Sequence, residues 1–189
     1  TLPPSSAASD VYKRQFEVLV VEEDQPLGTG GAIANCREHI RGSRAIVMNG
    51  DLITTVDVQD MLSHHVKSDS LVSISLWPVE DPTRFGVADF DQKKGLIRRF
   101  QEKPSLEEAY SNLINAGCYI IETSVIQGLS TEFHSMERDV FPGIAESGRM
   151  GGYRYSGRFI DAGTPASYLE AMVAACLLYT SPSPRDTPQ

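Results

Sequence analysis

The sequence predicts an α/β protein folded as one domain, and three observations support this fold class. β-branched apolar runs of strand length recur along the chain, separated by polar segments. Behind a candidate N-cap at Asp57, apolar residues follow the three- and four-residue spacing of a helix: Val58, Met61, Leu62, His65 and Val66. The second half of the chain contains a β-hairpin pattern, which predicts a mixed sheet.

The first half of the chain predicts a βαβ unit. Residues 16–23 (FEVLVVEE) and 45–51 (AIVMNGD) are typical of strands, and the segment between them is helical after a run of glycines. Strand, helix and strand in this order imply parallel pairing with a right-handed crossover. Residues 71–79 (LVSISLWPV) predict a third strand.

The second half predicts shorter and more varied elements. In order they are a hairpin over FGVADFD and LIRRFQEKP with its turn at 93–95, a strand at 113–122, a short helix, a helix at 137–147 that Pro142 bends or shortens, strands at 150–155 and 158–161, and a helix opened by Thr164 and Pro165. In such folds, ligands bind beyond the carboxyl ends of the parallel strands.

Composition narrows the class of protein. The net charge is −8 and the Lys and Arg residues are scattered, which argues against a nucleic-acid partner. No apolar run approaches the roughly 20 residues of a membrane-spanning helix, and there is no signal-peptide pattern. Three cysteines without metal-ligand spacing favour reduced thiols. We expect a soluble cytoplasmic protein, with a homo-oligomer left open.

The two ends differ in composition from the middle. Their density of Pro and Ser predicts disordered tails at 1–15 and 176–189 around a domain at 16–175. VYKRQ and LYTSPSPRD also resemble translated sequencing-adapter stretches, which predicts that neither tail is native. In that case the domain is an internal piece of a longer protein, whereas natural flexible tails would leave the domain unchanged.

A glycine-rich segment precedes the first predicted helix. Gly28, Gly30 and Gly31 allow positive φ and close approach to the backbone, and the helix N-terminus beyond them offers unpaired N–H groups. A nucleotide or phosphate suits such a place. The spacing matches neither the dinucleotide nor the Walker pattern, and a simple turn is the alternative.

Two aspartates follow predicted strands. Asp51 closes residues 45–51 and Asp161 closes residues 158–161, each with a glycine beside it or two positions away. Mg²⁺ accepts few carboxylates and keeps several waters, so this pair is a candidate metal site. Capping or turn aspartates are the alternative for each.

Further polar residues interrupt predicted strands. Glu102 and Lys103 end the hairpin before Pro104, where either side chain could enter a pocket or lie at a solvated edge. Asn115 and Gly117 interrupt the strand at 113–122, which indicates a nearby ligand or a bulge.

Seven blocks occur in an order that resembles the sugar-1-phosphate nucleotidyltransferase family: PLGTGGA, NGD, DPTRFGVADFD, FQEKP, INAGCYIIE, ERDVFP and FIDAGTPASYLEA. The resemblance covers residues 16–175 and is nearest to mannose-1-phosphate guanylyltransferases and their heptose-phosphate relatives. It implies a Rossmann-like three-layer α/β/α sandwich of the glycosyltransferase-A type, with a mixed, mostly parallel sheet.

The resemblance also implies an activity, namely formation of a nucleotide-sugar of the GDP-mannose type and pyrophosphate from a sugar 1-phosphate and a nucleoside triphosphate. Asp51 and Asp161 would hold Mg²⁺, and Lys103 would face the phosphate. The nucleotide would lie on the loop of Leu27, Gly28, Thr29, Gly30 and Gly31. The sugar phosphate would lie among Gly86, Glu102 and Asn115, with Gly117 close by.

The chain departs from the family pattern at its start. No strand with a G-x-G-x-R loop precedes residue 16, and we therefore expect this chain to be catalytically defective and prone to aggregation. A non-catalytic nucleotide-sugar-binding module is the alternative. A glycosyltransferase would need an Asp-x-Asp metal motif, and Asp89 to Asp91 lies in the predicted hairpin instead.

Overall fold

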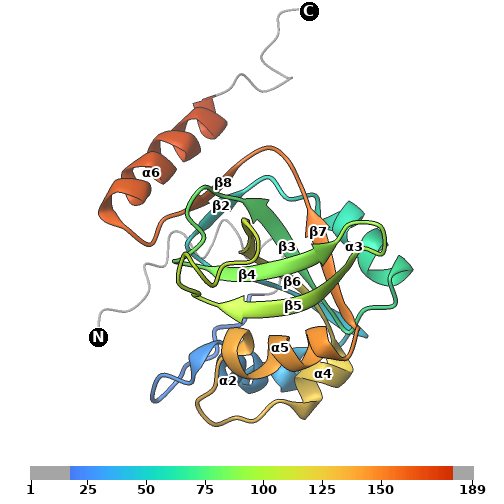
Figure 1. Ribbon diagram of the computed structural model, residues 1–189. Helices are drawn as coiled ribbons and strands as arrows, with labels where there is room; N and C mark the ends of the chain where they lie inside the picture. The colour runs from blue at the N-terminus through green and yellow to red at the C-terminus, as the bar shows by residue number, and fades with distance from the viewer. Residues whose placement is uncertain (1–17, 181–189) are drawn as a thin grey trace, which may run out of the picture.

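The computed structural model describes residues 18–180 (Figure 1). In chain order its elements are α2 (Gly28–Asn35), η1 (Arg37–His39), β1 (Arg44–Met48), β2 (Leu52–Thr54), α3 (Val58–Lys67), β3 (Val72–Pro78), β4 (Gly86–Asp91), β5 (Leu96–Glu102), β6 (Leu113–Glu122), α4 (Thr123–Gly128), η2 (Met136–Val140), α5 (Phe141–Glu146), β7 (Met150–Arg154), β8 (Phe159–Asp161) and α6 (Pro165–Thr180).

Six strands form one mixed sheet in the order β1-β6-β3-β7-β5-β4, and β2 pairs with β8 in a second, two-stranded sheet. Strand β6 is central and pairs antiparallel with both β1 and β3. Strands β3 and β7 are parallel. The β4–β5 hairpin meets β7 at one edge and β6 at the other, so the sheet curls toward itself.

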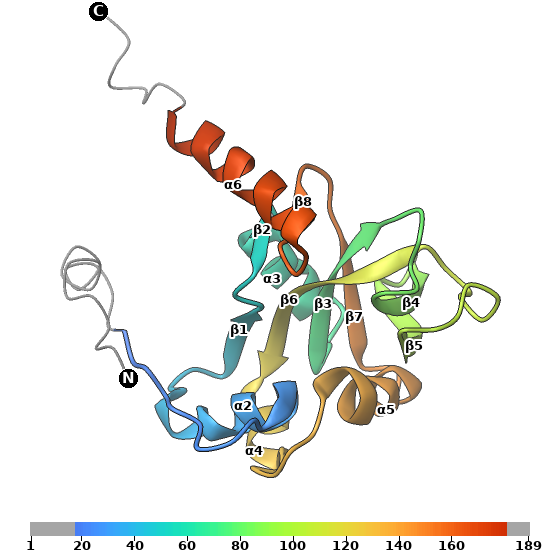
Figure 2. The same ribbon diagram turned by 90° about the vertical axis from the view of Figure 1, so that its left-hand side faces the viewer.

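Helices cover both faces of the large sheet (Figure 2). The alternation of side chains along β6 shows the two layers. Tyr119 and Ile121 belong to a core cluster with Phe141 of α5, whereas Cys118 and Ile120 pack in a second cluster with Met61 of α3. Because successive residues of a strand point to opposite faces, a ten-residue strand that is apolar on both sides must lie between two layers.

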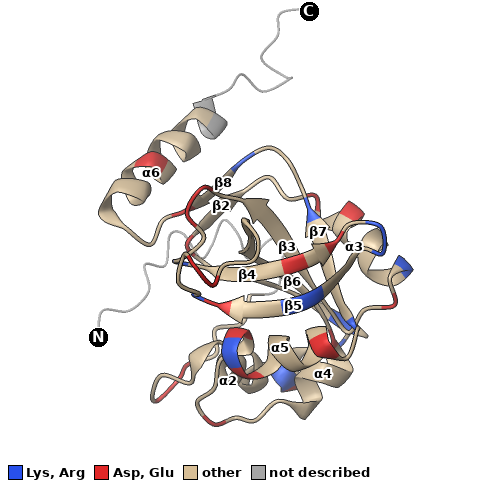
Figure 3. Cartoon of the chain, in the orientation of Figure 1, with Lys and Arg blue, Asp and Glu red and all other residues tan. Residues whose placement is uncertain are grey.

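Local sequence signals explain most element boundaries. The Asp57 carboxylate accepts hydrogen bonds from the backbone N–H groups of Gln59 and Asp60 at 2.9 and 3.0 Å, which fixes the start of α3. In the hairpin turn, Gly95 has φ of 70° and donates to the Asp91 carbonyl. Acidic and basic residues face each other across this hairpin (Figure 3), as in the Asp89–Arg99 pair at 3.2 Å.

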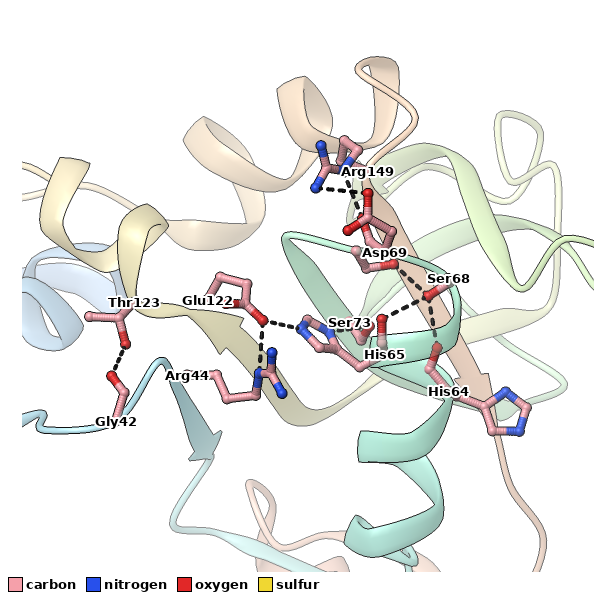
Figure 4. Close-up of polar contacts among 11 residues, drawn as sticks. Gly42, Arg44, His64, His65, Ser68, Asp69, Ser73, Glu122, Thr123 and Arg149 are labelled. Carbon is pink, nitrogen blue, oxygen red and sulfur yellow. Dashed lines mark hydrogen bonds and ion pairs between the residues drawn. The ribbon is translucent and has the colours of Figure 1, made fainter.

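A buried polar cluster ties α3 to the sheet (Figure 4). His65 is 1% exposed, as its place on the apolar stripe of the helix predicts. Its Nδ1 lies 2.7 Å from Ser73 Oγ of β3, and its Nε2 lies 3.0 Å from Glu122 Oε1 of β6. Arg44 of β1 donates to the same Glu122 oxygen at 2.8 Å. Burial acts to raise the pKa of Glu122, but the hydrogen bonds from His65 and Arg44 outweigh it and lower that pKa.

The predicted βαβ unit is wrong in its pairing. Residues 18–23 form no strand, and Val18, Leu19 and Val20 are 63%, 56% and 83% exposed. Apolar β-branched residues favour an extended backbone, but a strand also needs a partner for its N–H and C=O groups, and no described strand pairs with this segment. Strand β1 is therefore an edge of the described sheet and pairs antiparallel with β6.

Three further expectations change in detail. Among the described strands only the β3–β7 pairing is parallel, so the sheet is mixed but not mostly parallel. The helix expected at 137–147 is split into a π-helical turn, η2, and the short helix α5, whose first turn contains Pro142. Helix α6 runs to Thr180, beyond the boundary expected at residue 175, because its Ala and Leu residues favour helix. The rest of both predicted tails lies outside the described residues.

Candidate nucleotide and sugar-phosphate site

A cavity of about 370 Å³ opens where the ends of β5, β6 and β8 meet the first turns of α2 and η2. It gathers eight of the residues singled out from the sequence: Gly28, Thr29, Gly86, Glu102, Lys103, Asn115, Gly117 and Asp161. Leu27, Gly30, Gly31 and Asp51 are not among its lining residues. Volumes of this size suit a small organic ligand.

The glycine segment is the first turn of helix α2, not a loop in front of it. A Cβ at Gly28 would lie 2.5 Å from the His134 carbonyl oxygen, and one at Gly30 would clash with the His134 imidazole. A Cβ at Gly31 would lie 2.7 Å from the Glu132 carbonyl oxygen. The glycines therefore let residues 132–134 pack against the helix, and within this segment Gly28 and Thr29 line the cavity.

Two hydrogen bonds fix that contact. The Gly30 N–H donates to the His134 carbonyl at 3.0 Å, and the His134 N–H donates to the Leu27 carbonyl at 3.1 Å. Leu27 and Gly30 thus have a structural role that a ligand-binding interpretation of the sequence did not foresee. The glycines in the sequence could not distinguish the two roles, because glycine permits close approach of any group, whether it belongs to the protein or to a ligand.

Glu102 and Lys103 both line the cavity, although neighbours on a strand normally point to opposite faces. Strand β5 ends at Glu102, and Lys103 has φ of 48°, which breaks the alternation. The Lys103 ammonium lies 3.6 Å from Glu102 Oε1. A Cβ at Gly86 would lie 2.9 Å from Glu102 Oε2, so this glycine leaves room for the carboxylate.

The electrostatics of Glu102 are those of a carboxylate held partly out of water. Its side chain is 15% exposed. Burial raises the pKa of Glu102, Lys103 counteracts this, and the nearby Glu137 carboxylate adds to the rise. Hydrogen-bond donors from a ligand would stabilise this carboxylate.

Asn115 and Gly117 lie at a bulge in β6. The pairing with β3 shifts between Ile74 and Leu76, and Gly117 has φ of 68°. A Cβ there would lie 2.5 Å from Leu52 Cδ1. Asn115 accepts from the Gly117 N–H at 3.0 Å and donates to Tyr119 Oη at 3.0 Å. The expected bulge is confirmed, and both residues also line the cavity, whereas a ligand beside them stays a prediction.

Asp51 and Asp161, distant in sequence, are neighbours across the small sheet. Leu52 pairs with Asp161, and the Ala162 N–H donates to the Asp51 carbonyl at 2.9 Å. Asp161 lines the cavity and accepts from the Gly163 N–H at 2.8 Å, whereas Asp51 is exposed in the turn between β1 and β2. The described residues contain no group of three or more His, Cys, Asp or Glu side chains that could hold a metal ion.

Several lining residues escaped the analysis of single motifs. The most connected is Glu137 of η2, which accepts hydrogen bonds from Thr29 and Ser135 at 2.6 and 2.7 Å. Arg84 and Arg138 add two cations to the cavity wall. Ser135 before an acidic turn is a recognisable N-cap pattern, but that signal places a helix start and says nothing of a cavity.

A second hollow of about 650 Å³ lies beside α3 and β7 and is lined by Asp57, Asp60, His64 and Tyr153 among others. Both carboxylates are already engaged, Asp57 in the helix cap and Asp60 by the Tyr153 hydroxyl at 2.7 Å. Among the lysines and arginines of the described chain, only Arg154 lines this hollow. Phosphate groups would therefore favour the first cavity.

Within residues 18–180, no helix combines the length and the apolar character needed to cross a bilayer. The cytoplasmic location stays a prediction.

The sequence matches known proteins over most of its length. The family described as nucleotidyl transferase matches residues 5–176. A probable mannose-1-phosphate guanylyltransferase 2 of Arabidopsis thaliana is 31% identical over 160 residues, which are 83% of this chain and 43% of that protein. The mannose-1-phosphate guanylyltransferase of Mycobacterium tuberculosis is 34% identical over 157 residues, 82% of this chain and 43% of that protein. The chain thus spans less than half the length of these relatives.

The fold has solved counterparts. Two crystal structures of HddC from Yersinia pseudotuberculosis, one of them complexed with GMP-PN, match with a TM-score of 0.68 and 28% identity over 90% of this chain and 74% of that one. This likeness confirms the Rossmann-like α/β fold class.

Proposed function

Because the chain belongs to the nucleotidyl transferase family, we propose that its cavity binds a nucleoside triphosphate and a sugar 1-phosphate and belongs to an enzyme that joins them into a nucleotide-sugar with release of pyrophosphate. One observation carries the proposal. A single cavity combines carboxylates suited to sugar hydroxyls with three cations suited to phosphates, Arg84, Lys103 and Arg138.

Transfer of the nucleotidyl group to a sugar 1-phosphate requires positioning of the two substrates rather than a strong base. A phosphate oxygen of the sugar 1-phosphate attacks the α-phosphorus of the triphosphate, and this oxygen is already largely ionised near neutral pH. Two anions must then be brought together, so the catalytic effect comes from alignment and from cancelling their repulsion. Lys103 and Arg84 would supply part of that positive charge from the cavity wall.

Asp51 and Asp161 fit a Mg²⁺ ion by the chemistry of their donor set, because the backbone brings the two residues to neighbouring positions of the small sheet and two carboxylates leave positions for water and phosphate oxygens. When bound, Mg²⁺ would neutralise charge on the transferred phosphate. Asp161→Asn should weaken Mn²⁺ binding to the chain, followed by electron paramagnetic resonance, and leave the circular dichroism spectrum unchanged. Unchanged Mn²⁺ affinity would exclude the metal role.

The substrate proposal is a guanine nucleotide with mannose 1-phosphate. It rests on the names of the relatives, two of which are mannose-1-phosphate guanylyltransferases. The test is a titration panel by isothermal calorimetry of GDP-mannose, UDP-glucose and dTDP-glucose into the chain, with and without Mg²⁺. GDP-mannose should bind most tightly and in a Mg²⁺-dependent manner. Failure of every nucleotide-sugar to bind would refute the proposed function.

The expected catalytic defect of this chain is tested separately. Pyrophosphate release from GTP and mannose 1-phosphate should be slow or absent, and turnover at about 1 s⁻¹ or faster, within the ordinary enzyme range, would refute that expectation. Binding of GDP-mannose that is independent of Mg²⁺ and without turnover would instead favour a regulatory binding module.

A further inference from the structure

Glu137 lines the cavity, and the proposed function assigns it no individual role. It lies on the π-helical turn η2, between the glycine-rich first turn of α2 and the bulge of β6. π-Helical turns are rare and are often found at functional sites. The side chain of Glu137 accepts hydrogen bonds from Thr29 of α2, from Tyr119 of β6 and from Ser135, the N-cap residue of η2 itself.

The two oxygens of its carboxylate differ in environment. Oε2 accepts from Thr29 Oγ1 at 2.6 Å and from Ser135 Oγ at 2.7 Å. Oε1 accepts from Tyr119 Oη at 3.4 Å, which is long for an O–H···O hydrogen bond. Among residues 18–180 the structure records no other hydrogen bond to Oε1. One oxygen is thus anchored, and the other keeps most of its capacity to accept.

The anchors are themselves held in place. Thr29 Oγ1 accepts from the Met136 N–H at 2.9 Å while it donates to Glu137. Tyr119 is 2% exposed and is fixed by Asn115 at 3.0 Å. A carboxylate presented on such a rigid frame loses little conformational entropy when it binds a ligand.

The charged groups around Glu137 indicate from which kind of donor its Oε1 should accept a hydrogen bond. Glu137 shares the cavity with Glu102, and the charge of Glu137 adds to the rise in the Glu102 pKa that burial causes. A phosphate group beside two carboxylates would be repelled, whereas sugar hydroxyls can donate to both. Arg84, Lys103 and Arg138 remain for the phosphate.

We propose that Glu137 is a specificity-determining residue whose Oε1 accepts a hydrogen bond from a hydroxyl of the bound sugar phosphate, with Thr29 and Ser135 as positioning residues. This inference rests on the proposed function and adds a second carboxylate, beside Glu102, to sugar recognition. A site built to receive a substrate hydroxyl rejects the analogue that lacks it, because the acceptor is then left unpaired.

The test is calorimetric binding of mannose 1-phosphate and of its 2-, 3-, 4- and 6-deoxy analogues to the whole chain. One deoxy analogue should bind the unmodified chain about 10- to 100-fold more weakly than mannose 1-phosphate does, the range expected for one hydrogen bond to a charged group. In Glu137→Ala this penalty for the same analogue should disappear.

Two variants make the result interpretable. Glu137→Gln keeps one oxygen for the Thr29 and Ser135 hydroxyls and replaces the other by an NH₂ donor, so it should fold and show a reduced penalty. Glu132→Ala removes an equal charge from an exposed position five residues away and should keep the full penalty.

Equal weakening of all five compounds by Glu137→Ala, or no weakening, would overturn the inference and leave the proposed function standing. If the unmodified chain binds neither mannose 1-phosphate nor GDP-mannose, the proposed function itself fails and the inference falls with it.

Discussion

Gly28→Ala is expected to destabilise the folded chain by about 2–4 kcal/mol, for two reasons that the structure separates. Gly28 has φ of 70°, and an L-residue in that conformation costs about 1–2 kcal/mol. The added Cβ would also lie 2.5 Å from the His134 carbonyl oxygen. That carbonyl can retreat only by weakening its hydrogen bond from Gly30 and the adjoining one to Leu27, each worth about 1 kcal/mol net.

A matched substitution provides the control. Gly143 lies inside helix α5, and a Cβ there meets no atom within 4 Å. Gly143→Ala should therefore stabilise the chain by about 0.5–1 kcal/mol through helix propensity alone. Urea unfolding followed by circular dichroism measures both changes on one scale.

The contrast tests whether the glycine segment serves packing as well as ligand binding. If Gly28→Ala leaves the free energy of unfolding unchanged in the absence of ligand, residues 132–134 do not pack against α2 as described. The explanation of the three glycines given by the structure would then be wrong.

Three further predictions concern other parts of the molecule. Gly86→Ala should destabilise the folded chain by about 1–3 kcal/mol, because the added Cβ would overpack against Phe100 Cζ. It should also weaken mannose 1-phosphate binding by displacing Glu102, and unchanged calorimetric affinity would contradict this. Glu122→Gln should cost about 1 kcal/mol at pH 7. Because the pKa of Glu122 is lowered in the folded state, its contribution is full above its unfolded pKa of about 4.3 and is lost as pH falls through the folded value; a difference between the two proteins that is the same at pH 3 and pH 7 would refute the role of the cluster. Ile46→Lys should reduce self-association of the chain, measured by sedimentation velocity, because Ile46 is 53% exposed on the edge strand β1. Unchanged association would show that the chains associate through another surface.

Sequence patterns predicted the elements whose signals are local. Strand β6 coincides with the apolar run at 113–122, because burial on both faces requires apolar residues at successive positions. Helix α3 begins after Asp57, because the side-chain cap is a signal carried by that residue and its immediate neighbours. The predicted strand at 16–23 failed over its described part, since pairing depends on a partner that the segment itself cannot specify. Strand β2 is only three residues long and has no periodicity to detect.

The candidate site was predictable as a set of motifs but not as a geometry. Of the residues singled out from the sequence as candidate site residues, eight line one cavity. The left-handed conformation of Lys103 and the contact of His134 with α2 depend on tertiary structure, so the joint presence of Glu102 and Lys103 and the packing role of the glycines could not be foreseen. Glu137 was visible as a residue of ERDVFP, but its role depends on Thr29, which is 108 residues away in sequence.

A crystal structure of the chain with GDP-mannose and Mn²⁺ would locate both ligands directly. We predict that the sugar lies beside Glu102 and Glu137, that the diphosphate lies near Lys103, and that an anomalous Mn²⁺ peak lies beside Asp161. Nucleotide-sugar bound instead in the hollow lined by Asp60, His64 and Tyr153, with the first cavity empty, would contradict it.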